Sequence, residues 1–336
     1  MKNIVVIALL SVSGLVYSQQ ESQFASAFQN PYIYNAAAGG MSNVTQIDLV
    51  SRFQWVGMSQ SPTTINLTGH TVLNIGSSTS KHEYNPKKKP LYPRPDVIAG
   101  GVKHVVGGKV LSDNVGVFNR LGVYGSYAFH MPLTSDFNIG AGLGLGWSNF
   151  KINQSKVVLF DQNDDIYNLA LANSSQQNFL DANAGIVLYG KGLFFGASMT
   201  QMFKNKVRFD DVETGSNYNR HFYFNLSYGL KLGESVLEPG VIVKLSENTP
   251  ANLDFGARFI YKNASWIGVY GRTNSNVIFQ LGTTLVENLY VSYAYELGTG
   301  LLRNASSGTH EIQLGIYLGK KKSKKYSSAT DSEESK

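Results

Sequence analysis

The chain has 336 residues, including 34 glycines, 19 tyrosines and 18 phenylalanines but no cysteine. Charged residues make up only 15% of it, and no apolar run approaches the ~20 residues that a membrane-spanning helix needs. These values exclude a small disulfide-stapled secreted domain and a helical membrane protein. If the chain enters a bilayer, it does so as strands.

The formal net charge of +6 comes mainly from two polar segments. Residues 74–96 carry five basic and two acidic side chains, and residues 320–336 carry six basic and three acidic ones. Nucleic-acid binding usually requires a basic face interleaved with aromatic residues on a folded element. The charge distribution therefore does not indicate a nucleic-acid partner.

The first 43 residues read as two non-barrel segments. Lys2, an apolar run from Ile4 to Leu10 and small residues before Gln19 predict a cleaved secretory signal peptide at residues 1–18. Residues 19–43 are polar and aromatic without a clear period, and Pro31 prevents regular strand pairing there. We expect this second segment to be a periplasmic arm or plug.

The clearest strand pattern lies at residues 137–149, FNIGAGLGLGWSN, where apolar residues alternate with glycine or polar residues. A period of two excludes an amphipathic helix. An apolar face opposite a small or polar face is typical of a strand between lipid and a wet, crowded lumen. Glycine weakens a strand, so four glycines on one face indicate close approach across a narrow or filled lumen. A strand of a soluble β-sandwich is the alternative.

Similar segments follow one another along the chain. In chain order, we expect strands at residues 44–55, 63–73, 97–106, 117–129, 137–149, 180–189, 193–203, 221–232, 236–245, 252–261, 265–272, 277–285, 289–298 and 310–318. The fold class is therefore all-β, a transmembrane antiparallel up-and-down β-barrel of about 14 strands in a bacterial outer membrane, formed by residues 44–319.

The lengths of the connections support this topology. Short turns are expected at residues 132–136, 190–192, 233–235, 262–264 and 286–288, and longer loops at 151–178, 204–220 and 299–309. Outer-membrane barrels have short periplasmic turns and longer outer loops, whereas a soluble sandwich has no reason to sort its loops. Because the strand number is even, we expect both termini in the periplasm, together with the basic segment 74–96 and the tail 320–336.

Charged residues at inward positions predict a charge-paired filling of the lumen, with a conducting path as the alternative. They are Asp48, Arg52, Arg120, Asp254, Arg258, Glu296 and Glu311. Trp55, Trp147 and Trp266 fall at strand ends, where an interfacial aromatic girdle is the ordinary explanation.

Motifs for catalysis and metal binding are incomplete. Asp161, Asn163 and Asp165 have the opening spacing of a calcium loop, but Ile166 and Ala172 stand where glycine and glutamate are required. The six histidines lack paired zinc-ligand spacing, and there is no G-x-S-x-G motif. We expect a solvated acidic loop, no cofactor and no enzymatic activity. A hydrolase whose serine and histidine meet only in the fold remains open.

Several short motifs resemble the PorP/SprF family of the type IX secretion system, found in Bacteroidetes outer membranes. The motif residues are Asn30, Pro31, Tyr32, Asn35, Arg52, Gln54, Trp55, Pro62, Thr63, Thr64, His310 and Glu311. The chain departs from the family at Ala36, where a proline is frequent, and in its polar tail, because such barrels commonly end at an aromatic residue. An insertion signal would then lie at residues 312–318.

The resemblance implies a non-enzymatic barrel that anchors a periplasmic ring of PorK and PorN type proteins or assists the export of gliding adhesins. The expected partner-binding residues are Lys81, Lys87, Lys88, Lys89 and Arg94 in a proline-stiffened loop, and Lys320, Lys321 and Lys322 in the tail. Lysine-rich segments that merely keep the protein soluble are the plainer explanation. An outer-membrane pore for small solutes is the alternative function.

Overall fold

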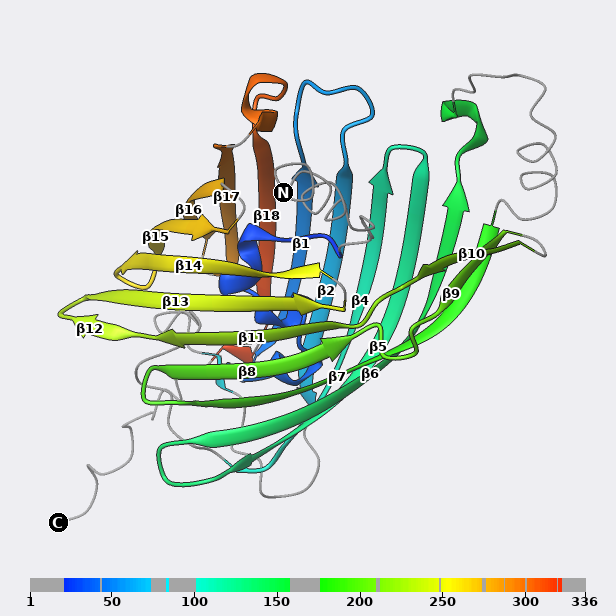
Figure 1. Ribbon diagram of the computed structural model, residues 1–336. Coiled ribbons are helices and arrows are strands. Elements are labelled where there is room, and N and C mark those ends of the chain that lie inside the picture. Colours follow the sequence, from blue (N-terminus) through cyan, green and yellow to red (C-terminus); the bar gives the residue numbers. More distant parts are fainter. Residues whose placement is uncertain are drawn as a thin grey trace, which may run out of the picture.

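The structure, a computed structural model, describes residues 21–42, 44–73, 83–84, 101–157, 176–209, 212–247, 249–273, 276–286, 288–299, 301–318 and 320–321. Its main feature is one large antiparallel sheet that closes on itself through the pairing of β11 with β13 (Figure 1). Within these ranges, no helix has the length and apolar character needed to cross a membrane.

The barrel contains 14 strands, as predicted. Their bounds are β1 (Thr45–Phe53), β2 (Thr63–Leu73), β4 (Lys103–Val115), β5 (Phe118–Pro132), β6 (Asn138–Ile152), β7 (Gln176–Gly190), β8 (Leu193–Thr200), β11 (His221–Tyr228), β12 (Leu230–Leu232), β13 (Ser235–Ser246), β14 (Thr249–Tyr261), β15 (Ser265–Arg272), β16 (Asn276–Val286), β17 (Leu289–Gly298) and β18 (Thr309–Leu318). Because β11 and β12 both pair with β13 and are separated only by Gly229, they form one interrupted strand.

Two regions differ most from the bounds expected from sequence. The third strand, expected at residues 97–106, is β4 at Lys103–Val115, which pairs with the full length of β2. The adjacent Gly107 and Gly108 obscure its alternation, so the pattern alone stopped too early. The loop expected at 204–220 contains a separate hairpin, β9 (Lys206–Phe209) with β10 (Val212–Asn217), and β8 ends at Thr200.

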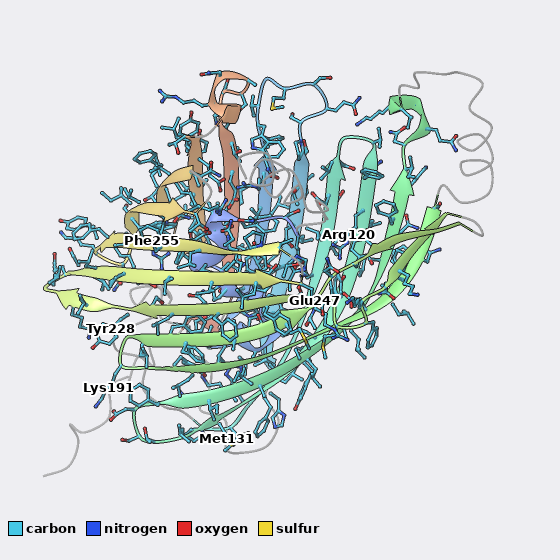
Figure 2. All side chains as sticks on the ribbon, in the orientation of Figure 1. Arg120, Met131, Lys191, Tyr228, Glu247 and Phe255 are labelled. Atoms are coloured by element: carbon cyan, nitrogen blue, oxygen red, sulfur yellow. The ribbon has the colours of Figure 1, made fainter. Side chains whose placement is uncertain are left out.

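The two faces of the wall differ as the period of two predicts. On β6, the inward Asn138, Gly140 and Gly142 are buried, while the outward Leu143 and Leu145 are 65% and 68% exposed. Met131, Tyr228 and Phe255, labelled in Figure 2, belong to the same apolar outer face. A continuous apolar belt of this kind is the surface that a barrel presents to lipid.

The two ends of the barrel differ in their connections. The short-turn end carries connections 133–137, 191–192, 233–234, 262–264 and 287–288, together with the long segment 74–102. The long-loop end carries the connections 54–62, 153–175, 201–220 and 299–308, but also the short connections 116–117, 247–248 and 273–275; the connections from β1 to β2 and from β4 to β5 are at the top of Figure 1. Most long connections therefore lie at one end of the barrel and most short ones at the other, but each end has exceptions.

Residues 21–42, here called the inner segment, lie inside the barrel (Figure 1). The segment forms three short 3-10 turns, η1 (Ala25–Phe28), η2 (Pro31–Ile33) and η3 (Ala36–Ala38), and every residue from Phe24 to Met41 is buried. Pro31 starts η2 with its fixed φ, and the Asn35 side chain accepts the Ala37 N–H at 2.9 Å to start η3. Breaking the path into turns lets the segment follow the curved wall.

Candidate functional site

A row of paired charges crosses the interior near the long-loop end. Arg52 donates to both oxygens of Glu296, at 2.7 and 2.8 Å, and to Glu311 at 3.2 Å. Arg272 joins Glu296 at 2.9 Å to Asp254 at 2.8 Å, and Lys244 completes the row with Asp254 at 2.6 Å. The row has three cations and three anions, so it is neutral as a whole. Removing one partner of such a buried pair typically costs about 3–5 kcal/mol.

Most of the charged residues that the sequence predicts to face the lumen are deeply buried. Asp48, Asp254, Arg258 and Glu296 are at most 2% exposed, and Arg258 pairs with Glu238 at 2.6 Å. Arg120 is half-buried near the start of β5 and donates to the Tyr124 hydroxyl at 3.3 Å. Arg258, Asp254 and Glu296 thus pair with other charges, whereas Asp48 accepts from neutral side chains, among them Asn30 and Gln313.

The carboxylate of Glu311 ties the inner segment to this row. It accepts the backbone N–H groups of Ala25 at 2.9 Å and Ser26 at 2.7 Å, at the start of η1. The first N–H groups of a helical turn have no partner within the turn, so an ionised acceptor is stabilising there. Glu311 therefore connects Arg52 on the wall to the backbone inside the lumen.

The motif residues of the inner segment make the next contacts. Asn30 donates its side-chain amide to Asp48 at 3.1 Å and to Thr68 at 3.0 Å. The Tyr32 hydroxyl lies 2.6 Å from Ser126. Polar side chains that are distant in sequence thus hold the segment in a single position.

Glycines in the wall provide room for the segment. A Cβ added at Gly142 would lie 2.6 Å from the backbone nitrogen of Ala37 in η3. A Cβ at Gly185 would lie 2.0 Å from Oδ1 of Asn35, whose amide nitrogen donates to the Ile186 carbonyl at 3.0 Å. Of the four glycines that stood out in the sequence, Gly142 makes room for the inner segment, whereas Gly140, Gly144 and Gly146 make room for His130, Asn183 and Tyr124 of the wall itself.

The other motif residues brace the long-loop end. The Gln54 N–H donates to the Pro62 carbonyl at 2.9 Å, and the Trp55 N–H donates to Thr309 Oγ1 at 3.2 Å. Thr64 donates to Asp113 at 2.7 Å. His310 Nδ1 lies 2.7 Å from the Tyr293 hydroxyl, and Thr63 pairs with Phe53 in the ladder of β1 and β2.

Sequence reasoning missed the aromatic contacts of the inner segment. Phe28 stacks on Tyr270 and Tyr34 stacks on Tyr223, each with ring centroids 4.2 Å apart. Such pairs typically contribute about 0.5–1.5 kcal/mol beyond burial. No local pattern announces them, because the partners lie on different strands nearly 200 residues or more away.

The tryptophans do not form one girdle. Trp147 is 38% exposed on the outer face, and Trp55 lies in the turn after β1. Trp266 is only 3% exposed and packs inside against Tyr290, so the girdle prediction is wrong for it. Gly282 leaves the space that the indole fills, since a Cβ there would lie 2.2 Å from the ring.

The inner segment crosses the lumen from one end to the other. The Glu21 carboxylate accepts from Thr200 at 2.8 Å and Tyr223 at 2.7 Å, at the long-loop end. Gly40 lies near the opposite end, where its N–H donates to His70 at 3.1 Å. The barrel itself starts and ends at the short-turn end, since Thr45 of β1 pairs with Leu318 of β18, but the inner segment carries the first described residue to the opposite end.

The two basic segments meet at the short-turn end. Lys320–Lys321 form β19, which pairs in parallel with β3 (Glu83–Tyr84) of the 74–102 connection. Lys81, Lys87, Lys88, Lys89, Arg94 and Lys322 lie outside the described residues, as does the acidic loop from Asp161 to Asp165. Within the described ranges, no group of three or more histidine, aspartate or glutamate side chains is placed to hold a metal ion.

A closed 14-stranded antiparallel barrel with an apolar outer face and a charge-paired interior is an outer-membrane β-barrel protein. The family model described as "Type IX secretion system membrane protein PorP/SprF" matches residues 16–316, and the chain belongs to this family. No curated protein gives a significant match.

Solved barrels resemble the chain only distantly. The toluene transporter TodX of P. putida has 9% identity and a TM-score of 0.46, with 89% of this chain and 95% of TodX covered. The outer membrane protein Omp33 of Acinetobacter baumannii has 8% identity and a TM-score of 0.44, with 83% and 99% covered.

Proposed function

We propose that this protein is a non-enzymatic outer-membrane component of the type IX secretion machinery that anchors or couples a periplasmic ring complex of PorK and PorN type proteins. The alternative role within the same machinery is to assist the export of gliding adhesins. In this proposal, the short-turn end and the tail 320–336 face the periplasm.

The observation that carries the proposal is the pairing of β3 with β19. It joins two basic segments that are more than 200 residues apart in sequence, with five and six basic side chains against two and three acidic ones. Together they have a formal charge of +6, from 11 basic minus 5 acidic residues. Two segments with this excess of positive charge suit an acidic partner, and the prolines between residues 86 and 95 restrict the conformations of the first segment before binding.

The experiment deletes residues 81–94 and, separately, residues 322–336. The barrel strands are intact in both variants, so we expect each to remain folded by heat-modifiable migration, while crosslinked co-purification of the ring falls several-fold. Deleting a similar length of the long-loop end, residues 159–172, is the control for loop shortening. Undiminished co-purification in both basic-segment variants would count against the proposal.

The alternative, a pore for small solutes, requires an open path. The inner segment is buried from Phe24 to Met41 within the barrel, which favours a closed protein. We expect no steady conductance from the purified protein in planar bilayers. Steady channels at neutral pH would favour the pore instead.

A further inference from the structure

One edge of the sheet is open at the long-loop end. β7 pairs with β6 from Gln176 to Tyr189, but with β8 only from Ala184 to Gly190. Residues 176–183 therefore have a neighbouring strand of the sheet on one side only. Neither the proposed docking at the short-turn end nor the filling of the lumen uses this edge.

The open part of β7 lies beyond the apolar belt. Trp147 of β6 pairs with Leu180 of β7, and both side chains are exposed on the outer face. The next outward positions are Asn149 and Lys151 on β6 and Asn178 on β7. This change from apolar to polar marks where the wall leaves the hydrocarbon. Only outside the hydrocarbon can a strand keep unpaired N–H and C=O groups, because water satisfies them there.

The backbone groups at this edge point away from β6. In an antiparallel ladder, the N–H and C=O of one residue point to the same side, and successive residues alternate between the two sides. The Ala182 carbonyl accepts the N–H of Met202, which follows the end of β8, at 3.1 Å. The Leu180 carbonyl accepts the Asn205 side-chain amide at 2.8 Å. Alternation then directs the backbone groups of Asn178 to the same side, where none of the described strands pairs with them.

The hairpin of β9 and β10 does not occupy this edge, since its two strands pair only with each other. Tyr218, directly after β10, packs against Phe150 and Phe179, with ring centroids 6.2 and 5.5 Å apart. Both phenylalanines are at inward positions of β6 and β7. At the base of the hairpin, Lys204 pairs at 2.7 Å with Glu247, which is labelled in Figure 2. These contacts hold the base of the hairpin on the lumen side of β7.

The open edge has none of the features that usually protect an exposed strand from pairing. Residues 176–180, QQNFL, include no proline and no charged residue, and their ladder with β6 has no bulge. Leu180 is 70% exposed, and Phe203, between Met202 and Asn205 in sequence, is 56% exposed. The edge therefore offers backbone donors and acceptors together with apolar side chains, which is the combination that an added strand uses.

We propose that this edge binds an extended segment of a partner polypeptide, which adds to the sheet as a strand beside β7. The N–H and C=O of Asn178 hydrogen-bond to the backbone of the segment, and an apolar side chain of the segment packs against Leu180. The proposal is independent of the docking function, because the basic segments lie at the other end of the barrel. Failure of either proposal leaves the other standing.

The test selects peptides from a phage-displayed library of random dodecapeptides on the mature full-length protein in detergent. The selected sequences are synthesised and titrated by fluorescence anisotropy against two variants. Asn178→Pro removes the N–H at the open edge and leaves the ladder with β6 intact, a position at which strands tolerate proline. Asn178→Ala is the matched control, because it removes the same side chain and keeps the N–H. We expect about tenfold weaker binding to Asn178→Pro than to Asn178→Ala, with amide exchange of β6 equal in both.

A second measurement reports the geometry and does not depend on the proline variant. Because the chain has no cysteine, Asn178→Cys provides a single thiol. Selected peptides with a cysteine at successive positions should form disulfides with it mainly at every second position, since alternate side chains of an added strand lie on one face. The absence of any selected peptide, equal binding to the proline and alanine variants, or disulfides without this period would overturn the proposal. Self-association of the protein that Asn178→Pro abolishes would also overturn it, by making a second copy the occupant.

Discussion

Replacing Gly142 with alanine tests whether the wall holds the inner segment by shape. The added Cβ would lie 2.6 Å from the Ala37 nitrogen and 2.8 Å from the carbonyl carbon of Ala36. Both are backbone atoms, so no rotamer change relieves the contact. Because ordinary contacts begin at 3.4 Å, η3 must move away by about 0.8 Å (3.4 minus 2.6).

The expected cost follows from this displacement. Overpacking of a well-packed interior typically costs about 1–3 kcal/mol. The movement also strains the bonds from the Ala37 N–H to Asn35 and from the Gly40 N–H to His70, at 2.9 and 3.1 Å. A loss of about 2 kcal/mol would raise the population of the dislodged inner segment roughly thirtyfold.

Hydrogen exchange measured by mass spectrometry gives the readout. Amides of residues 31–41 should exchange roughly thirtyfold faster in Gly142→Ala, while the strands remain protected. Gly125→Ala is the matched control, because the residue lies on the outer side of β5 and its new Cβ would meet nothing within 4 Å. Equal exchange in the two variants would refute the role of shape, and faster exchange of the whole barrel would show a general loss of stability instead.

Two further predictions concern the charged contacts of the inner segment. Glu311→Gln removes the ionised acceptor of the Ala25 and Ser26 N–H groups, so we expect a loss of about 1.5–3 kcal/mol and faster proteolysis within residues 21–30. Unchanged protection would contradict this. Burial alone would raise the pKa of the Glu21 carboxyl, but the positive charges of Lys109, His221 and Arg120 outweigh it and lower the pKa from 4.5 to about 2. Its stabilising contribution is therefore complete above pH 4.5 and is lost as the pH falls toward 2. Exchange of residues 21–28, corrected for intrinsic rate, should accelerate over that range, and by less in Glu21→Gln than in the unmodified protein.

The strands could be predicted from sequence because their cause is local. In a strand between lipid and lumen, each residue faces the environment opposite to that of its neighbour, so Leu143 and Leu145 alternate with Gly142 and Gly144 along the chain itself. The same rule yields the number of strands. The rule gives the wrong bounds for β4, because the adjacent glycines Gly107 and Gly108 interrupt the alternation of apolar and polar residues.

The contacts inside the lumen could not be predicted from sequence, because they depend on the tertiary structure. Period and composition mark a residue as inward but do not say which inward residue it meets, since strand register and barrel closure set that. Arg52 and Glu296 are 244 positions apart, yet they form the central ion pair. The fit of Ala37 against Gly142, the burial of Trp266 and the pairing of β3 with β19 have the same origin. The sequence therefore determined the barrel, whereas only closure of the sheet around the inner segment decided which side chains meet inside it.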